Sequence, residues 1–550
     1  MAAIDLARPA GFGAFTNWAG RLNAVFVIAL VLICFGCGQG DRNLSTVTID
    51  SGSISGTMDA GVRVFRGIPY GAPPIGDRRW KPPQPVEPWE GVRQCTEWGF
   101  SCIHVPYPSD SLWTGPEWGD PAEQSEDCLH LNVWTTATSA DEKRPVMVWI
   151  HGGSLQHESG SVGAYGGANL ARKGVVAVTI NYRLGPFGYL AHPELTRESE
   201  NQSSGNYGVL DQIAALEWVQ RNIAAFGGDP NRMTIFGESA GSWSVNFMVA
   251  SPLAKGLFHR AIGQSGAGFG PMVHLSEDRA DLRSAEETGT ALAAVLGSAE
   301  EPASLEAMRA VPATEILAKF AEVPGAYVGP NVDGWVFPDE IHTIFEQGRQ
   351  NRVPVIVGSN ADEGSMYAGP NAPATVEDFR LLARERYGDR ADAFLEAYPV
   401  TDDSDVRDTF VAAVGDALFT WEMRMWARMT STVDADAWLY HFTRVPPIAQ
   451  SHTLGSHHGA EIVYVIGNFH LASFTPEPED ERLAETMSGY WVNFATTGDP
   501  NGAGLPEWPA YNVEEEPFME FGDVIRSGNH LLEEECDFFE RYNAARRLNP

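Results

Sequence analysis

Nearly unbroken apolar runs recur along this chain, and the residues between several of them follow a helical spacing. Runs of this kind are typical of strands that are covered on both faces of a sheet. The helical spacing is clear at 206–226, where Leu210, Ile213, Leu216 and Ile223 form an apolar stripe. The predicted strands are 129–134, 145–150, 175–181, 233–236, 260–264, 353–358 and 438–442. Strand and helix in alternation predict an α/β fold with a mainly parallel central sheet flanked by helices.

Other stretches extend this picture. Short β-branched runs at 47–49 and 62–65 predict strands between Gly-rich turns, ahead of the main sheet. Long helical stretches at 284–320 and 376–429 predict large helical insertions that cap the sheet. Because no repeat and no clear linker interrupts residues 45–545, we expect them to form a single domain.

The first forty residues have a pattern of their own. Arg8 and Arg21 precede an apolar run at 24–35, which is too short to span a membrane as a helix. A run of this length behind basic residues fits the apolar centre of a secretory signal. We therefore expect residues 1–40 to direct export to the periplasm, the outside of the cell or the cell envelope.

Cys37 follows this run among small residues, as at a bacterial lipoprotein site. Cys34 and Phe35, however, occupy positions where that pattern prefers aliphatic and small residues. The only membrane contact that we expect is through a lipid on Cys37. Export would make disulfides plausible among the remaining cysteines, which are Cys95, Cys102, Cys128 and Cys536.

The charge of the chain excludes some partners. The 550 residues carry a formal net charge of -34, which argues against nucleic acid and against anionic membrane surfaces. The sequence has no His-Glu-x-x-His motif and no phosphate-binding glycine loop. The acidic run at 402–405 lacks the glycine of a calcium loop. We therefore expect no metal and no cofactor.

The strand at 233–236 leads into the spacing Gly237-x-Ser239-x-Gly241, and an apolar run at 243–250 continues as a predicted helix. A strand that enters a helix through so tight a turn needs small residues beside the serine. It leaves the serine strained, with its hydroxyl above the sheet edge. This arrangement predicts a nucleophile elbow at Ser239.

Small residues also follow the strand at 145–150, in the order His151, Gly152, Gly153, Ser154. Backbone N–H groups in such a turn can face a neighbouring site, as an oxyanion hole requires. The expected donors are the amides of Gly153, Ser154 and Ala240.

A serine nucleophile needs a histidine base and an acid that orients the base, and in this fold they follow in the order serine, acid, histidine. The strand at 353–358 leads to Asp362 and Glu363, and a later Gly-rich loop carries His457 and His458. The residues alone leave both choices open.

Several longer segments carry a family resemblance: FGGDP (226–230), TIFGESAG (234–241), SEDCL (125–129), FRGIPY (65–70), NYRL (181–184) and NYGVLD (206–211). Together they resemble the type-B carboxylesterase and cholinesterase family of α/β-hydrolases, over about residues 47–539. The resemblance implies a serine hydrolase of small-molecule carboxylic esters with Ser239 as nucleophile. It places the family's acid and histidine on Glu363 and His458. It also implies a disulfide between Cys102 and Cys128.

The chain departs from the family at Ser154 and Leu155, where a third glycine and an aromatic residue are common. Ser154 keeps an N–H, so the hole can still form, and its side chain could narrow the pocket. Trp118 lies ten residues before Cys128, where cholinesterases carry a tryptophan that binds a quaternary ammonium. With Glu238 beside the nucleophile, this position raises the alternative of a preference for cationic esters.

A further alternative is a non-catalytic binding protein, because the family includes cholinesterase-like adhesion proteins that lack the serine. All three triad positions are filled here, which favours an enzyme. The acyl and alcohol groups of the substrate are not encoded in these motifs.

Overall fold

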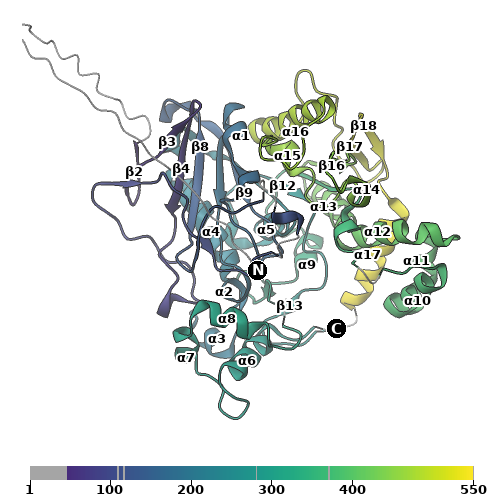
Figure 1. Cartoon of the computed structure of the whole chain (residues 1–550), viewed down its shortest axis with the longest axis horizontal. Coiled ribbons are helices and arrows are strands. Elements are labelled where there is room, and N and C mark those ends of the chain that lie inside the picture. Colours follow the sequence, from purple (N-terminus) through teal and green to yellow (C-terminus); the bar gives the residue numbers. More distant parts are fainter. Residues whose placement is uncertain are drawn as a thin grey trace, which may run out of the picture. The chain divides into compact units, whose positions relative to one another are not determined.

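The computed structural model describes residues 46–548, apart from 108–110, 115–117, 280–281, 327 and 370–371. The predicted export segment and Cys37 lie outside the described residues. One sheet of 11 strands organises the described part of the chain (Figure 1). In spatial order its strands are β18 (Ile525–Asn529), β17 (Pro517–Phe521), β16 (Ala437–Phe442), β15 (Val355–Asn360), β12 (Arg260–Gln264), β11 (Gly228–Glu238), β9 (Arg144–Ile150), β10 (Val176–Ile180), β8 (His130–Thr135), β4 (Val62–Pro69) and β3 (Thr57–Asp59).

The centre of this sheet is parallel, from β10 through β9, β11, β12, β15 and β16 to β17. Antiparallel pairing is confined to β8, β4 and β3 on one side and to β18 on the other. The predicted α/β fold with a mainly parallel sheet is confirmed. Successive residues of β9 enter opposite cores, with Val148 in one and Trp149 in the other. Burial on both faces explains why this strand is apolar throughout.

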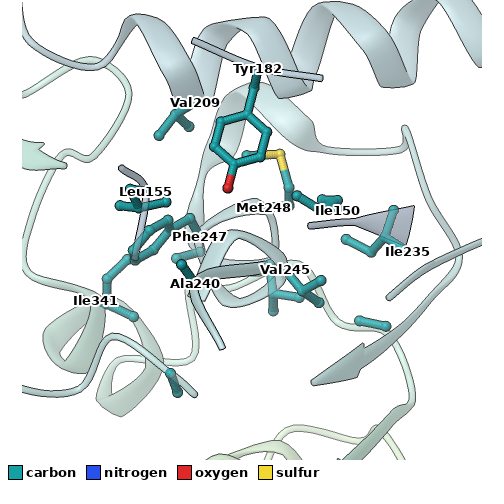
Figure 2. Packing of buried hydrophobic residues seen from close by; sticks show 14 of the residues in the cluster. Ile150, Leu155, Tyr182, Val209, Ile235, Ala240, Val245, Phe247, Met248 and Ile341 are labelled. Atoms are coloured by element: carbon teal, nitrogen blue, oxygen red, sulfur yellow. The ribbon is translucent and has the colours of Figure 1, made fainter. Parts of the chain in front are cut away.

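Helices cover both faces of the sheet. Helices α4 (Tyr207–Asn222), α5 (Ala240–Ala250) and α13 (Trp421–Ser431) contribute to the core that contains Val148. Helices α1 (Ala168–Arg172), α15 (Ile462–Ile466) and α16 (Pro478–Thr497) contribute to the core that contains Trp149. Figure 2 shows Ala240, Val245, Phe247 and Met248 of α5 packed near Ile150 and Ile235 of the sheet.

The remaining helices lie mostly in the two predicted insertions. Figure 1 shows α6 to α8 as one teal group and α10 to α12 as a separate green group. Their bounds are α2 (Gly185–Tyr189), α3 (Pro193–Glu198), α6 (Ala285–Leu296), α7 (Leu305–Ala310), α8 (Ala313–Phe320), α9 (Ile341–Glu346), α10 (Val376–Tyr387), α11 (Ala391–Ala397), α12 (Val406–Gly415), α14 (Ser451–Leu454) and α17 (Glu533–Leu548). Three small sheets pair β1 (Thr46–Ile49) with β2 (Gly52–Ser55) and β5 (Val92–Gln94), β6 (Ser101–Cys102) with β7 (Gln124–Ser125), and β13 (Val273–His274) with β14 (Asn331–Val332).

Two expectations need correction. The strand predicted at 353–358 is observed as β15, Val355–Asn360, and it begins after Pro354, which has no N–H for the ladder. The stretch 376–429 is not wholly a capping insertion. Its last helix, α13, contacts β15 and β16 and belongs to the layer that packs directly on the sheet.

The disulfide that the resemblance implies, between Cys102 and Cys128, is present. The thiols of Cys95 and Cys536 are free and buried. Within the described ranges, no helix has both the length and the apolar character that crossing a membrane requires.

Arg444, just after strand β16, forms ion pairs with residues at the start of α16 and with Asp523, and we call this cluster the arginine hub. The guanidinium of Arg444 contacts Asp480 at 2.7 Å, Glu477 at 2.6 Å and Asp523 at 2.7 Å. Asp480 is fully buried and also accepts a hydrogen bond from the hydroxyl of Tyr464 at 2.7 Å. Burial alone would raise the pKa of Asp480, and the hydrogen bond from Arg444 holds it below 3.8. Arg444 is therefore the main group that keeps this carboxylate charged, together with the N–H of Glu477 and the hydroxyl of Tyr464.

We expect Arg444→Met to lower the free energy of unfolding by about 3–5 kcal/mol at pH 7, because it leaves a buried carboxylate without its cation. Urea unfolding measures the loss, and Arg482→Met is the control. Arg482 lies on α16, as Asp480 does, its side chain is 64% exposed, and its pair with Glu479 should contribute under about 1 kcal/mol.

The loss should shrink as the pH falls through about 4. The lowered pKa of Asp480 stabilises the wild type fully only at a pH above the unfolded-state pKa of this group. Below that pH the wild type loses this stabilisation, so its stability comes closer to that of the variant. Equal losses for Arg444→Met and Arg482→Met would contradict a structural role for the hub.

Candidate active site

Ser239 occupies the single residue between strand β11 and helix α5, with φ 56° and ψ -123°. A positive φ is costly for a residue other than glycine, and its N–H is tied to the carbonyl of Gln264 at 2.8 Å. The turn has no room for residues larger than glycine at positions 237 and 241. A Cβ added at Gly237 or Gly241 would lie 2.6 Å or 2.1 Å from the carbonyl oxygen of Ile150. The geometry is that of a nucleophile elbow.

The turn after β9 lies against this serine. A Cβ added at Gly152 would lie 3.3 Å from Cβ of Ser239, so only glycine allows this approach. Gly153 and Ser154 both have positive φ values, 85° and 57°. Among the described residues, no backbone acceptor takes the N–H of Gly153, Ser154 or Ala240. These three amides are available to an oxyanion.

The departure at 154–155 has a structural explanation. Ser154 is exposed and Leu155 is buried, although both have left-handed backbone (φ 57° and 60°). The side chain of Ser154 is therefore in solvent, and that of Leu155 lines a cavity behind the turn.

Of the two acids and two histidines, the structure brings Glu363 and His458 together. Nδ1 of His458 lies 2.5 Å from Oε2 of Glu363, whose other oxygen accepts the N–H of Asn360 at 2.8 Å. Asp362 instead accepts the N–H of Ser456 at 2.8 Å. Nδ1 of His457 lies 2.9 Å from the backbone oxygen of its neighbour. Within the described residues, Nε2 of His458 has no hydrogen-bond partner, so it is available to take a proton.

We expect Glu363→Gln to lower kcat by about 10⁴-fold, because a neutral amide neither fixes the histidine tautomer nor stabilises the imidazolium. Asp362→Asn is the matched control and should stay close to the wild-type kcat, since the Asp362 carboxylate accepts its hydrogen bond from the loop backbone at Ser456. Steady-state kinetics with a chromogenic ester decide between the two. A greater loss in Asp362→Asn would reassign the acid.

A second carboxyl group faces the histidine. Oε1 of Glu238 lies 3.2 Å from Nε2 of His458, and both side chains are buried. Burial raises the pKa of Glu238 well above its ordinary value. Burial would lower the pKa of His458, and the opposing charges of Glu238 and Glu363 raise it to about 9. Because the two groups are in contact, the protonation of one changes the pKa of the other.

This coupling predicts the pH dependence of the reaction. A base must be unprotonated, so kcat/KM should rise with pH through an apparent pKa above the ordinary 6.5 of histidine. Glu238→Gln removes a charge that favours the imidazolium and should move this limb to lower pH. A full pH–rate profile of both proteins measures the shift. An unchanged limb would show that Glu238 does not influence the base.

Three aromatic residues near His458 were not assigned from the sequence. Phe419 stacks on the imidazole with ring centroids 4.4 Å apart, and Tyr367 packs edge-on at 5.4 Å. Phe419 lies on a π-helical turn, Asp416–Thr420, of a kind that is frequent at functional sites. Tyr367 also has a hydrogen-bonding contact with Ser239. In the sequence Tyr367 lies four residues after Glu363, and this closeness to a predicted acid could have indicated a place near the site. No local pattern indicated the same for Phe419.

The third is Trp113. A Cβ added at Gly459 would lie 2.8 Å from the Trp113 ring and 3.5 Å from Oε1 of Glu238, so this indole borders the site. Trp118 is 8% exposed and packs edge-on against Trp113 at 4.6 Å and Tyr165 at 6.0 Å. Trp118 thus lies behind Trp113, and its cation-binding role stays a prediction.

Among the described residues, no group of three or more His, Cys, Asp or Glu side chains is placed to hold a metal ion.

A strained serine between strand and helix, on a mainly parallel sheet, defines a serine hydrolase of the α/β-hydrolase class. The model of the carboxylesterase family matches residues 43–539. The chain therefore belongs to the carboxylesterase family, and it is an ester hydrolase rather than a non-catalytic binding protein.

Individual relatives agree. A protein named fumonisin B1 esterase from Sphingopyxis macrogoltabida is 37% identical, over 93% of each chain. The para-nitrobenzyl esterase of Bacillus subtilis (strain 168) is 34% identical, over 85% of this chain and 93% of its own. The crystal structure of a carboxylesterase from Geobacillus stearothermophilus superposes with a TM-score of 0.78 at 33% identity, covering 90% of this chain and all of that one.

Proposed function

We propose that this chain is an exported serine carboxylesterase that works through an acyl-enzyme on Ser239, with His458 as base and Glu363 as the acid that orients it. The observation that carries the proposal is the 2.5 Å contact between buried Glu363 and Nδ1 of His458, whose Nε2 is left without a hydrogen bond in the described chain.

The proposed reaction has two halves. Oγ of Ser239 attacks the ester carbonyl carbon while Nε2 of His458 takes the hydroxyl proton. The oxyanion binds the amides of Gly153, Ser154 and Ala240, and the collapse of the tetrahedral intermediate expels the alcohol, which leaves with the proton from Nε2. Water then attacks the acyl-enzyme, again giving its proton to Nε2. The acid is released and Ser239 recovers its hydroxyl proton.

The test of this proposal is covalent trapping. A fluorophosphonate ester should inactivate the protein with one adduct per chain, and peptide mass analysis should locate it on Ser239. The nucleophile is a different residue if the adduct forms elsewhere. An active protein that the reagent does not label would contradict a serine mechanism.

We also propose that residues 1–40 are an export segment and that residues 45–545 form one catalytic domain. The Cys102–Cys128 disulfide supports export, because such bonds persist outside the reducing cytoplasm. Cell fractionation with thiol labelling tests this proposal, and a lipid-modified peptide that begins at Cys37 would identify an anchored form. Full-length cytoplasmic protein with free thiols would contradict export.

The substrate class is a carboxylic ester, and the esters in the names of the two relatives are the first to test. A second candidate is a preference for cationic esters, favoured by the indole of Trp113 and the carboxyl of Glu238 beside the site. A cation–π contact should give about a two- to thirty-fold preference for a choline ester over its uncharged isostere. The comparison is made in wild type, Trp113→Ala and Trp118→Ala, and a ratio that neither variant changes would contradict this candidate.

A further inference from the structure

A cavity of about 660 Å³ lies beside segments that adjoin Ser239, and it is within the size range of ligand pockets. Its walls include Leu155, from the turn of the oxyanion donors, and Trp243, whose N–H donates to the carbonyl of Ser239 at 2.9 Å. A third wall comes from the loop after β12, where a Cβ added at Gly266 would lie 2.7 Å from the Ser239 carbonyl oxygen. The cavity is therefore built on the same three segments that hold the nucleophile.

The body of this cavity is apolar. Phe247 of α5, Met272, Trp421 of α13 and Phe539 of α17 line it together with Leu155. Figure 2 shows Leu155 next to Phe247, and both residues line the cavity. A space of this size and lining suits an extended hydrocarbon chain.

The cavity has few charged side chains, and more of them are basic than acidic. Of its lining residues only Arg386, Arg546 and Glu422 are acidic or basic. The carboxyl of Glu422 is buried and accepts the N–H groups of residues 267, 269 and 270 at 3.1–3.2 Å. Burial raises the pKa of Glu422 to about 8, so this group is largely neutral at pH 7. The cavity is thus lined by two basic side chains, Arg386 and Arg546, in a chain whose formal net charge is -34.

The two arginines lie beside a pair of tyrosines that pack against each other. Tyr387 of α10 and Tyr542 of α17 also line the cavity and pack edge to face, with ring centroids 5.1 Å apart. The guanidinium of Arg386 lies 5.8 Å from the Tyr387 ring, and that of Arg546 lies 5.8 Å from the Tyr542 ring. Each cation is thus held against an aromatic face, and both line the same cavity.

We propose that this cavity binds the chain of an ester substrate whose far end carries a carboxylate, with Arg386 and Arg546 as its recognition residues. This inference rests on the proposed function, since it names the substrate class of the same site. The apolar body would take the methylene chain, and the two guanidiniums would take the carboxylate, for which arginine is the best-matched side chain.

The experiment compares methyl half-esters of linear dicarboxylic acids with methyl esters of monocarboxylic acids of equal chain length. We expect kcat/KM to favour the half-ester by about five- to thirty-fold at the best chain length, and the ratio to fall as salt rises. The ratio should fall towards one in Arg386→Gln/Arg546→Gln. Arg384→Gln is the matched control, because Arg384 is exposed on the same helix and does not line the cavity. It should keep the wild-type ratio.

Calorimetric titration of Ser239→Ala with the half-ester measures binding without turnover. Binding that weakens about five- to thirty-fold in the arginine double variant supports the inference. This holds even if the wild-type protein hydrolyses no ester, a result that would contradict the proposed function and not the inference. A half-ester ratio near one at every chain length, or a ratio that the double variant leaves unchanged, would overturn the inference.

Discussion

We expect Ser239→Ala to lower kcat by about 10⁶-fold. The side chain supplies the only protein atom that bonds to the acyl group in the proposed mechanism. The amides of Gly153, Ser154 and Ala240 remain in the variant, so a residual acceleration of about 10³-fold over water should persist. The measurement is kcat on an activated ester, with burst kinetics to detect the acyl-enzyme.

Ser242→Ala is the control for this variant. Ser242 is three residues further along α5, and its hydroxyl donates to the carbonyl of Gly266 at 2.5 Å. This change removes a buried serine from the same helix without touching the proposed chemistry, and we expect it to lower stability far more than kcat. Substantial turnover in Ser239→Ala would contradict the proposed nucleophile.

The second large effect is expected at His458. We expect His458→Gln to lower kcat about as much as Ser239→Ala, because the hydroxyl then has no base and the departing alcohol has no acid. The Ser239→Ala/His458→Gln double variant should be no slower than either single variant, since the two residues act as a unit. Additive losses in the double variant would contradict this coupling.

His457→Gln provides the matched control, because His457 is adjacent and buried, and its ring nitrogen Nδ1 contacts the backbone oxygen of its neighbour. It should retain most of the activity of the wild type. Thermal unfolding of both histidine variants should be compared, so that a folding defect is not taken for a chemical one. A dominant loss in His457→Gln would reassign the base.

Patterns over short distances allowed much of the fold to be predicted from the sequence. Strands buried on both faces must be apolar at every position, so β9 and β10 were located within one residue of their observed ends. The elbow was also visible, because a tight strand-to-helix turn requires the spacing Gly237-x-Ser239-x-Gly241. These constraints act between neighbours in the chain, and neighbours are what a sequence displays.

The choice between the two acids and the two histidines was different. Asp362 and Glu363 are adjacent, as are His457 and His458, so no local pattern separates them. The family resemblance indicated one member of each pair, and the tertiary structure gives the geometry. Only the turn at 363–366 and the loop before α15 bring Glu363 within 2.5 Å of His458 across 95 residues of chain.

The surroundings of the site were decided by the tertiary structure alone. Phe419 reaches His458 through a π-helical turn, and Arg386 and Arg546 meet at one cavity from helices far apart in the chain. Contacts of this kind depend on how whole helices pack against one another. Many different sequences are compatible with the same packing, so the sequence alone does not show which side chains meet. The sequence by itself therefore determined the sheet and the spacing of the elbow, and the family resemblance indicated ester hydrolysis. The packing of α10, α13 and α17 determined the shape and charge of the space that a substrate would enter.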